Sequence, residues 1–524
     1  MIARPTGDPG NLGSLLCAGP DADRVALIEV TPGAAERRFS FGTLHAWADA
    51  VARGLLGRGL QCGQRVAIVA ANSADFVAAY LGIMRAGLVA VPVNWRQPAA
   101  RVAAIVHDAD TALILCDARR RALCPPGLPI LDFEQGLPAS LQPGAFTAVQ
   151  PTADDAALFL YTSGSSGRPK GVMLSHHGYR WGTLTRTRGA DLVRHRFLVA
   201  APLYHMNALN TAQLALAGRG TLVLMPQFDA AAYLEALQRY RCTWVTAIPT
   251  MVALLAREQA LLRHADLSAV ERVRLGSEPV SARILQQART IFPRAALSNG
   301  YGTTETGAVI FGPHPAGRET PAQALGYAQP AVQIRLAAGD DLAATEGVLQ
   351  VRSPALMIGY HKLPEQTAAA FTADGFYITG DVIRRDAGGL HHFVGRADDM
   401  FVCGGENIYP GEVEQVLERH PDVHQACVVA VADALKGCKP VAYVVPRPGA
   451  QPSEEALKAH ALALAPAYQH PRRVLFVDAL PVMGTDKIDR KAVAAWATAL
   501  AAEDAFPIDP PPAAASPGTT RGAP

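Results

Sequence analysis

The chain has 524 residues, of which 49% are hydrophobic, and a formal net charge of +2. This length allows at least two domains with large cores, and the nearly neutral charge argues against a dedicated binder of nucleic acid or of a membrane surface. The 8 cysteines are scattered without a CxxC pair, so neither a disulfide framework nor a zinc site is indicated. The sequence shows no signal peptide and no apolar run long enough for a transmembrane segment, so we expect a cytoplasmic protein.

Strand and helix patterns alternate through most of the chain. Apolar residues at helical spacing predict a helix in FSFGTLHAWADAVARGLLGRGL and further helices at about 74–85 and 230–239. Short apolar runs between the helices predict strands: RVAIVA, LVAVPVN, TALILC, ALFLYT, FLVAA, TLVLM, TWVTAI and VRLG. The proline-rich stretch 122–155 is predicted to be a surface connection. This alternation predicts a layered α/β body with parallel strands.

The most informative stretch is YTSGSSGRPKGV, residues 161–172. It combines hydroxyl donors, glycines whose backbone N–H groups can turn towards one point, and a lysine, which together suit a polyphosphate. These groups are Thr162, Ser163, Gly164, Ser165, Ser166, Gly167 and Lys170. The stretch differs from the P-loop of ATPases, because Gly171 follows the lysine where that pattern has Ser or Thr. An ordinary glycine-rich turn after a strand remains the alternative.

A second polar group of residues is NGYGTTETG, residues 299–307. It offers the flat ring of Tyr301, the hydroxyl of Thr304, and the carboxylate of Glu305, a hard oxygen ligand suited to Mg²⁺. Further along, YITGD ends at Asp381 and GRADD contains Arg396. A carboxylate accepts hydrogen bonds from hydroxyls, and an arginine binds oxygens while staying charged. Each of these groups taken singly is also typical of a polar turn or an ordinary surface charge.

Two further segments contain candidate pocket residues. APLYHMN, residues 201–207, places His205 after an apolar strand, where a histidine with a purely structural role is the common alternative. LGSEPVS, residues 275–281, contains Glu278, which either enters a pocket or caps the following helix, and capping is the expected role. Cys403, in FVCGGENIYPGEVE, is expected to be a small packing residue.

These segments, followed by LPVMGTDKIDRKAV at 480–493, occur in the order seen in the adenylate-forming superfamily, and the chain resembles its acyl-CoA synthetase branch over nearly its whole length. The resemblance implies a large multi-layer α/β domain at 1–395 that binds ATP and the acyl group, a hinge at 396–399, and a small mobile α+β lid at 400–505. Composition predicts that the tail, residues 506–524, is disordered.

The resemblance also implies a role for each motif. The catalytic residues would be Lys487, Thr304, Glu305 and His205. ATP would bind to residues 162–167 and Lys170, with Thr162 and Glu305 holding Mg²⁺, and to Asn299, Gly300, Tyr301, Gly302, Thr303, Asp381 and Arg396. The acyl pocket would include His205, Met206, Gly276 and Ser277. Asp398 would be the hinge, and Gly404 and Gly405 would line the tunnel for the thiol arm of CoA.

The implied reaction joins a carboxylic acid to CoA through an acyl-adenylate, with ATP converted to AMP and pyrophosphate. The resemblance favours a fatty, hydroxy or aryl acid. Asp486 stands where the family usually has glycine, directly before Lys487. Two alternatives stay open: a ligase that loads a carrier protein, and, because of Asp486 alone, a catalytically impaired nucleotide-binding regulator. A homodimer is compatible with either alternative and with the ligase.

Overall fold

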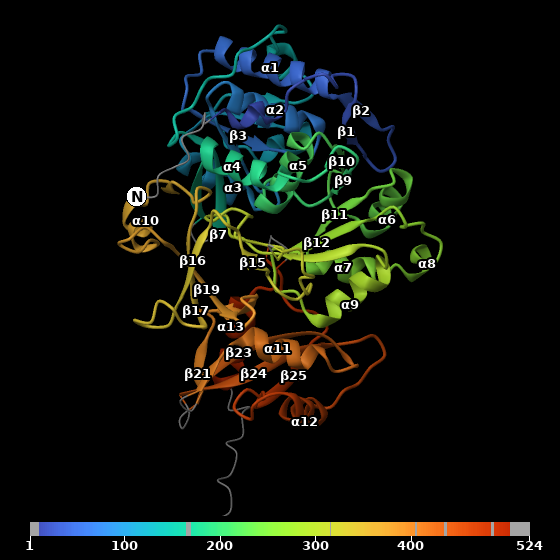
Figure 1. Ribbon diagram of the computed structural model, residues 1–524, viewed down its shortest axis with the longest axis vertical. Helices are drawn as coiled ribbons and strands as arrows, with labels where there is room; N and C mark the ends of the chain where they lie inside the picture. Colours follow the sequence, from blue (N-terminus) through green and yellow to red (C-terminus); the bar gives the residue numbers. More distant parts are fainter. Residues whose placement is uncertain are drawn as a thin grey trace, which may run out of the picture. The chain divides into compact units, whose positions relative to one another are not determined.

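The computed structural model describes residues 10–163, 169–314, 316–403, 406–433, 437–483 and 487–502. Its contacts divide the chain into two compact units, Met1–Asp398 and Asp399–Pro524 (Figure 1). The predicted tail at 506–524 lies outside the described residues.

The first sheet of the N-terminal unit has seven strands in the order β18-β8-β7-β4-β3-β5-β6. Its bounds are β3 Arg65–Val69, β4 Val89–Pro92, β5 Thr111–Cys116, β6 Ile130–Asp132, β7 Ala156–Ser163, β8 Pro169–Ser175 and β18 Gly359–Tyr360. The five strands from β7 to β6 run parallel, whereas β8 and β18 pair antiparallel at one edge. The antiparallel edge brings residues near 360 next to the predicted phosphate stretch.

The second sheet also has seven strands, in the order β13-β12-β11-β9-β10-β1-β2. Its bounds are β1 Val25–Glu29, β2 Arg37–Ser40, β9 Arg196–Val199, β10 Thr221–Leu224, β11 Trp244–Ala247, β12 Arg272–Gly276 and β13 Ala296–Gly300. All neighbours are parallel except β1 and β2. The parallel α/β architecture predicted from the alternation of strands and helices is therefore confirmed.

Helices cover both sheets. They are α1 Phe41–Gly57, α2 Ala74–Arg85, α3 Ala99–Asp108, α4 His176–Thr187, α5 Met206–Ala217, α6 Ala230–Arg239, α7 Pro249–Leu255, α8 Gln259–Leu262, α9 Ala282–Ile291 and α10 Pro364–Ala369. Short 3₁₀ helices span Leu12–Leu15, Ala118–Leu123 and Pro138–Ser140. The predicted helices at 74–85 and 230–239 have these bounds in the structure. Serine side chains cap several N-termini, as Ser73 does for α2 by accepting from the N–H of Phe76.

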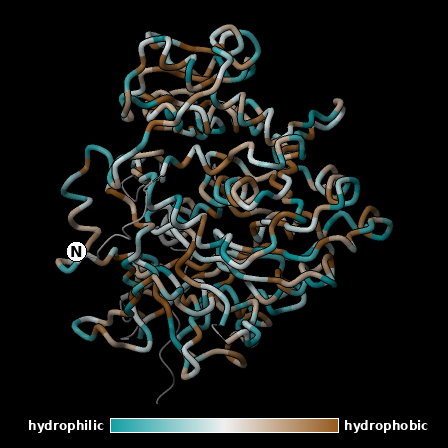
Figure 2. The backbone as a smooth tube through the Cα atoms, turned by 45° about the horizontal axis from the view of Figure 1, so that its top comes forward, coloured by the Kyte–Doolittle hydropathy of each residue, from teal (hydrophilic) through white to brown (hydrophobic). Residues whose placement is uncertain are grey.

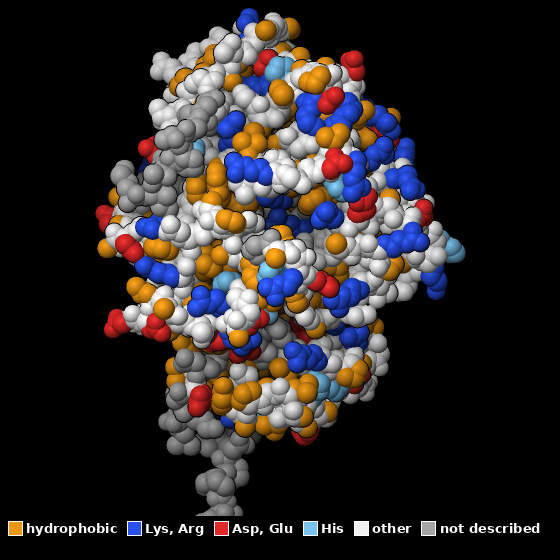
Figure 3. All heavy atoms as spheres, viewed as in Figure 1, with side chains coloured by type: hydrophobic (Ala, Val, Ile, Leu, Met, Phe, Trp, Pro, Cys, Tyr) orange, Lys and Arg blue, Asp and Glu red, His pale blue; other side chains and the backbone are white. Residues whose placement is uncertain are grey.

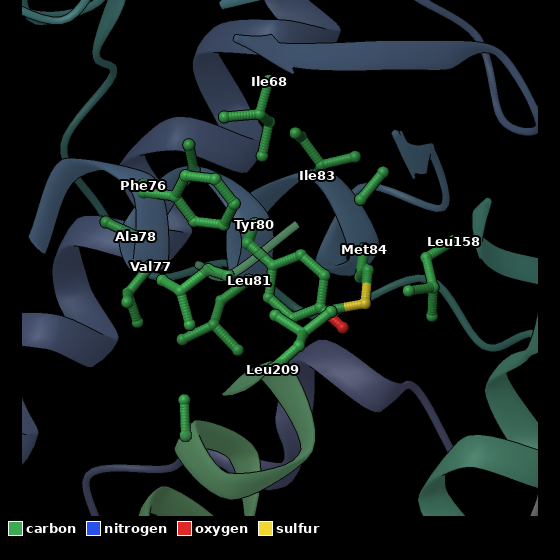
Figure 4. Close-up of a cluster of buried hydrophobic side chains, with 14 of the residues drawn as sticks. Ile68, Phe76, Val77, Ala78, Tyr80, Leu81, Ile83, Met84, Leu158 and Leu209 are labelled. Carbon is green, nitrogen blue, oxygen red and sulfur yellow. The ribbon is translucent and has the colours of Figure 1, made fainter. Parts of the chain in front are cut away.

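The largest core of the N-terminal unit surrounds α2. Phe76, Tyr80 and Met84 of this helix are at most 2% exposed. Figure 4 shows them among Ile68 of β3 and Leu209 of α5. Because α2 is buried on nearly all sides, it joins the sheet to the neighbouring helices instead of lying on the surface.

A third, antiparallel sheet was not predicted, because residues 1–395 were interpreted as one layered α/β body. Its order is β16-β17-β19-β20, with bounds Gln333–Ala337, Glu346–Arg352, Tyr377–Arg385 and His391–Arg396. A two-stranded pair, β14 Phe311–Gly312 and β15 Tyr327–Ala328, precedes it. In β16, polar and apolar residues alternate, as is typical of an antiparallel strand with one solvated face. Asp381 and Arg396 lie on this sheet, so it contributes directly to the candidate site.

The C-terminal unit is a small α+β fold, as predicted. Its strands are β21 Phe401–Cys403, β22 Glu406–Ile408, β23 Val423–Asp433, β24 Gly437–Pro446 and β25 Arg473–Phe476. Its helices are α11 Pro410–Glu418, α12 Glu454–Leu464 and α13 Arg490–Ala502. Cys403 is 3% exposed and belongs to the core of this unit, which confirms its packing role.

The distribution of hydrophobic and charged residues over the structure agrees with the nearly neutral net charge of +2. Hydrophobic and hydrophilic stretches alternate along the backbone in Figure 2. Within the described residues, no helix is both long and apolar enough to cross a membrane. Basic and acidic side chains are interspersed over the face seen in Figure 3.

A buried histidine ties the N-terminal segment to α4 and makes stability dependent on pH. The N–H of Leu12 donates to Nδ1 of His176 at 3.0 Å, and burial lowers the pKa of His176 to about 4. The unfolded chain, with a histidine pKa near 6.5, therefore binds more protons as the pH falls. We expect the free energy of unfolding to drop by up to about 3 kcal/mol from pH 7 to below pH 4 on account of this group. Urea unfolding of wild type and His176→Gln across this range measures it, and an identical pH slope in both proteins would contradict the assignment.

Candidate active site

The predicted phosphate stretch forms the end of a hairpin between β7 and β8. Thr162 lies opposite Lys170 in the strand register, and Ser163 lies opposite Pro169. The two strands therefore present Thr162 and Lys170 side by side at the mouth of the connecting loop. The predicted residues Gly164, Ser165, Ser166 and Gly167 lie outside the described residues, as does the side chain of Ser163.

Tyr360 links this hairpin to the second motif. Nζ of Lys170 lies 5.1 Å from the centroid of the Tyr360 ring, and the Tyr360 hydroxyl donates to Oε1 of Glu305 at 3.1 Å. Burial and the neighbouring Glu305 carboxylate raise the pKa of Tyr360 to about 12, so its hydroxyl stays protonated and keeps donating. Sequence reasoning missed Tyr360, because no motif marks it and only the pairing of β18 with β8 brings it here.

The NGYGTTETG turn has a defined shape. The N–H of Thr303 donates to Oγ1 of Thr306 at 3.0 Å, and Thr306 is fully buried. A Cβ added at Gly302 would lie 2.3 Å from the carbonyl oxygen of Gly307, so only glycine fits there. The backbone carbonyl of Glu305 accepts from the N–H of Met357 at 2.8 Å. These contacts hold Thr304 and Glu305 at one end of β13, while the amide of Asn299 donates to the carbonyl of Gln323 at 3.4 Å.

Tyr301, Asp381 and Arg396 form a second linked group. The Tyr301 hydroxyl donates to Oδ2 of Asp381 at 2.5 Å, and Nη1 of Arg396 donates to Oδ1 at 3.0 Å. Asp381 is 5% exposed, and burial raises its pKa although Arg396 and Tyr301 act in the opposite direction. The structure thus brings together three residues that are separated widely in the sequence and were predicted to hold one nucleotide.

Arg396 also joins Asp381 to the end of the N-terminal unit. Its Nε and Nη2 donate to the two carboxylate oxygens of Asp398 at 2.8 and 3.1 Å. This guanidinium lowers the pKa of Asp398 in spite of its partial burial. Asp398 is the last residue of the N-terminal unit.

The predicted acyl-pocket residues follow parallel strands of the second sheet. His205 and Met206 begin α5 after β9, Gly276 and Ser277 end or follow β12, and Tyr301 follows β13. The carboxyl ends of parallel strands share one edge of a sheet, so these residues gather at the edge where α/β proteins bind ligands. A Cβ added at Gly276 would lie 2.6 Å from the carbonyl oxygen of Gly300, which brings this loop against the NGYGTTETG turn.

The expected cap role of Glu278 is wrong. The residue that caps α9 is Ser281, whose Oγ accepts from the N–H of Ile284 at 3.4 Å. Ser281 stands directly before the helix, which is the position a cap requires. Ser277 adopts a positive φ of 69°, so the backbone turns sharply between the strand and Glu278.

Lys487 belongs to the C-terminal unit. Its carbonyl accepts from the N–H of Met483 at 2.7 Å, an antiparallel bridge joins Val482 to Ile488, and its side chain is exposed. Arg490, three residues on, donates to both carboxylate oxygens of Glu414 at 2.6 and 2.5 Å, which anchors the start of α13. Asp486 and the predicted tunnel residues Gly404 and Gly405 lie outside the described residues.

Comparisons with known proteins agree with this arrangement. A family model described as AMP-binding enzyme matches residues 17–361, and one described as AMP-binding enzyme C-terminal domain matches 412–487. The chain is 32% identical over 481 residues to a sulfoacetate–CoA ligase of Cupriavidus necator, covering 86% of this chain and 91% of the relative. It is 33% identical over 454 residues to a feruloyl-CoA synthase of an Amycolatopsis species, covering 84% and 90%. The crystal structure of ATP-bound MatB from Rhodopseudomonas palustris superposes with a TM-score of 0.84 at 28% identity, covering 93% of this chain and 99% of that one.

Proposed function

The chain belongs to the AMP-binding enzymes, the adenylate-forming superfamily, and we propose that it joins a carboxylic acid to CoA at the expense of ATP, through an acyl-adenylate. The observation that supports this most directly is the continuous set of contacts from Lys170 through Tyr360 to Glu305. It places a cation for phosphate oxygens next to a carboxylate for a metal ion, at the mouth of a glycine-rich hairpin. MgATP requires both groups together.

The residues present fit a magnesium ion. The Glu305 side chain accepts a hydrogen bond from the Tyr360 hydroxyl at Oε1, which leaves carboxylate lone pairs for a hard cation. Glu305 and Thr162 would hold Mg²⁺, and when bound it would neutralise charge on the phosphate oxygens. Lys170 and the N–H groups of the hairpin would orient the same phosphates from the other side.

The nucleoside would bind along the second linked group. The ring of Tyr301 would lie against adenine, and Asp381 with Arg396 would bind the ribose hydroxyls. Asp381 is already fixed by two hydrogen bonds, so it needs no rearrangement to accept more. This fixed geometry would place the α-phosphate near Thr304, in line with the acid carboxylate that attacks it.

Two half-reactions would follow. The acid carboxylate attacks the α-phosphate, pyrophosphate leaves, and the CoA thiol then attacks the acyl carbonyl with departure of AMP. Lys487 would stabilise charge in the first step, and the segment with Gly404 and Gly405 would admit the thiol arm in the second. Both lie in the C-terminal unit, so we propose that this unit reorients about Asp398 between the steps. The division of the chain directly after Asp398 supports that position for the hinge. His205 would form the wall of the acyl pocket.

The test is the release of pyrophosphate and AMP from MgATP across a panel of short, medium-chain, hydroxy and aryl acids, with and without CoA. We expect AMP release to require both an acid and CoA. Pyrophosphate released in a single turnover regardless of CoA would replace the proposal by a carrier-protein ligase. A relative supports that second candidate: a fatty acid–[acyl-carrier-protein] ligase of Streptomyces coeruleorubidus, 29% identical over 476 residues. No turnover with any acid would contradict both.

The names of the relatives leave the acid class open, because they include a sulfoacetate, a feruloyl and an indoleacetate ligase. We also propose a cytoplasmic location. All eight cysteines are free thiols, which supports a reducing compartment.

A further inference from the structure

Two arginines lie beneath the NGYGTTETG turn, and among the described residues no carboxylate forms an ion pair with either of them. Arg274, in the middle of β12, donates from Nη2 to the carbonyl of Ala308 at 3.3 Å. A Cβ added at Gly300 would lie 2.2 Å from Nε of Arg274, so this guanidinium runs directly against the backbone of the turn. Arg186, near the end of α4, is close enough that the charge of Arg274 lowers its pKa.

Arg186 lines a small cavity next to the segment that follows the NGYGTTETG turn. The cavity volume is about 10 Å³, room for about one water-sized group. Its wall comes from β8, α4, α5, the segment after the turn and the segment after β17: Leu174, Gly178, Tyr179, Gly182, Arg186, Asn210, Gly307, Ala308, Val309 and Ala355. Ala308 therefore lines the cavity and accepts from Arg274, which places Arg274 directly behind this wall. Asn210 lies on α5, one turn from the predicted pocket residue Met206.

The charges of these arginines are unfavourably placed in the protein alone. Both side chains have intermediate exposure, and burial lowers the pKa of Arg274. Burial and the charge of Arg274 lower the pKa of Arg186 to about 9. Within the described part of the chain, neither guanidinium lies at ion-pair distance from a carboxylate. Two like charges that are partly desolvated and unpaired destabilise a fold, so an anion from outside the chain is the group that would balance them.

We propose that Arg186 and Arg274 bind a second anionic group of the substrate, and that the acid is a short one with a carboxylate or sulfonate at the end remote from the reacting carboxylate. This inference rests on the proposed function and names its substrate class. A planar guanidinium can bind either a carboxylate or a sulfonate. Arg186, which lines the cavity, would contact the anion directly, and Arg274, which lies on the other side of the cavity wall, would add a second positive charge. The cavity has room for about one oxygen atom of that anion, so the rest of the end group would lie outside it, and a compact end group fits this arrangement better than a ring or a long alkyl chain.

The experiment compares matched acids in which an anionic group replaces the terminal methyl group: propanoate with malonate, butanoate with succinate, and butanoate with 3-sulfopropanoate. The readout is kcat/KM for CoA-dependent AMP release, together with KM for ATP. We expect at least one of the doubly charged acids to exceed its singly charged match by at least about 30-fold. Arg186→Gln and Arg274→Gln should lose at least about 30-fold with that acid while changing little with the singly charged match.

Matched controls come from the same elements. Arg188 follows α4 and Arg272 begins β12, and both are exposed. Arg188→Gln and Arg272→Gln should retain the preference of the wild type. The wild-type comparison needs no variant, so the inference stays testable even when a substituted protein fails to fold.

The outcomes separate the inference from the proposed function. CoA-dependent turnover that favours singly charged acids would overturn the inference and leave the ligase intact. An equal loss with doubly and singly charged acids, or a rise in KM for ATP with every acid, would also overturn it, because it would assign the arginines to the fold or to the nucleotide. If no acid supports AMP release, the proposed ligase activity is contradicted, and the inference is contradicted with it.

Discussion

Lys487→Ala should abolish adenylation while leaving the second half-reaction largely intact. Lys487 is exposed at the end of a short hairpin in the C-terminal unit, so its loss removes a positive charge without disturbing a core. The α-phosphate is the centre attacked in the first step, whereas the acyl carbonyl is the centre attacked in the second. Removing one donor positioned for the first of these centres costs about 10²–10³-fold or more. Acid-dependent release of pyrophosphate measures the first step, and AMP release from supplied acyl-AMP and CoA measures the second.

The control for this substitution is Lys491→Ala. Lys491 is also exposed and lies on α13, directly after the segment that holds Lys487. The control should adenylate at the wild-type rate. If Lys487→Ala slows both half-reactions equally, the lysine serves both steps or the fold of the C-terminal unit, and the proposed division of labour is wrong.

Hydrophobic periodicity predicted the parallel part of the fold well because those elements are buried from two sides. The helix at 74–85 is almost entirely buried, and its neighbouring strands β3 and β4 are continuous apolar runs. Such runs are visible in a sequence without any knowledge of partners.

The antiparallel sheet was missed for the opposite reason. In β16, glutamine and arginine alternate with apolar residues, and only Leu336 of that strand is buried. A strand of this kind depends on its cross-strand neighbours, as in the pairing of Arg335 with Gln350 across β16 and β17. Those neighbours are set by long-range register, which one sequence does not display.

The same difference between local sequence motifs and long-range strand pairing applies to the residues of the candidate site. Tyr301, Asp381 and Glu305 were predicted as site residues because each belongs to a polar sequence motif, and the structure places Asp381 in the middle of β19, hydrogen-bonded to Tyr301. Tyr360 was missed, since its role follows from the pairing of β18 with β8. Arg186 and Arg274 were missed as well, because a single arginine in a helix or strand is usually a solvated surface charge, and only the fold shows that these two lie together near one cavity.

Glu305→Gln should produce the second large loss, in adenylation and in its dependence on magnesium. Glutamine is nearly isosteric with glutamate, so the backbone contact from Glu305 to Met357 and the hydrogen bond from Tyr360 can both persist. What disappears is the negative charge that a hard cation requires. Loss of several kcal/mol of charge stabilisation corresponds to about 10²–10³-fold in rate. The Mg²⁺ concentration for half-maximal pyrophosphate release should rise together with this loss.

Tyr360→Phe separates the effect of the negative charge of Glu305 from the effect of the orientation of its side chain. It removes the hydroxyl that donates to Oε1 at 3.1 Å but keeps the carboxylate and the ring that faces Lys170. Removing a hydrogen bond to a charged acceptor costs about 1.5–3 kcal/mol at most, so we expect a smaller loss than with Glu305→Gln and a normal requirement for Mg²⁺. A variant Glu305→Gln whose magnesium dependence equals that of the wild type would show that this carboxylate acts on the protein rather than on the metal. The ion would then depend on other oxygens near the hairpin, with Thr162 the first to test.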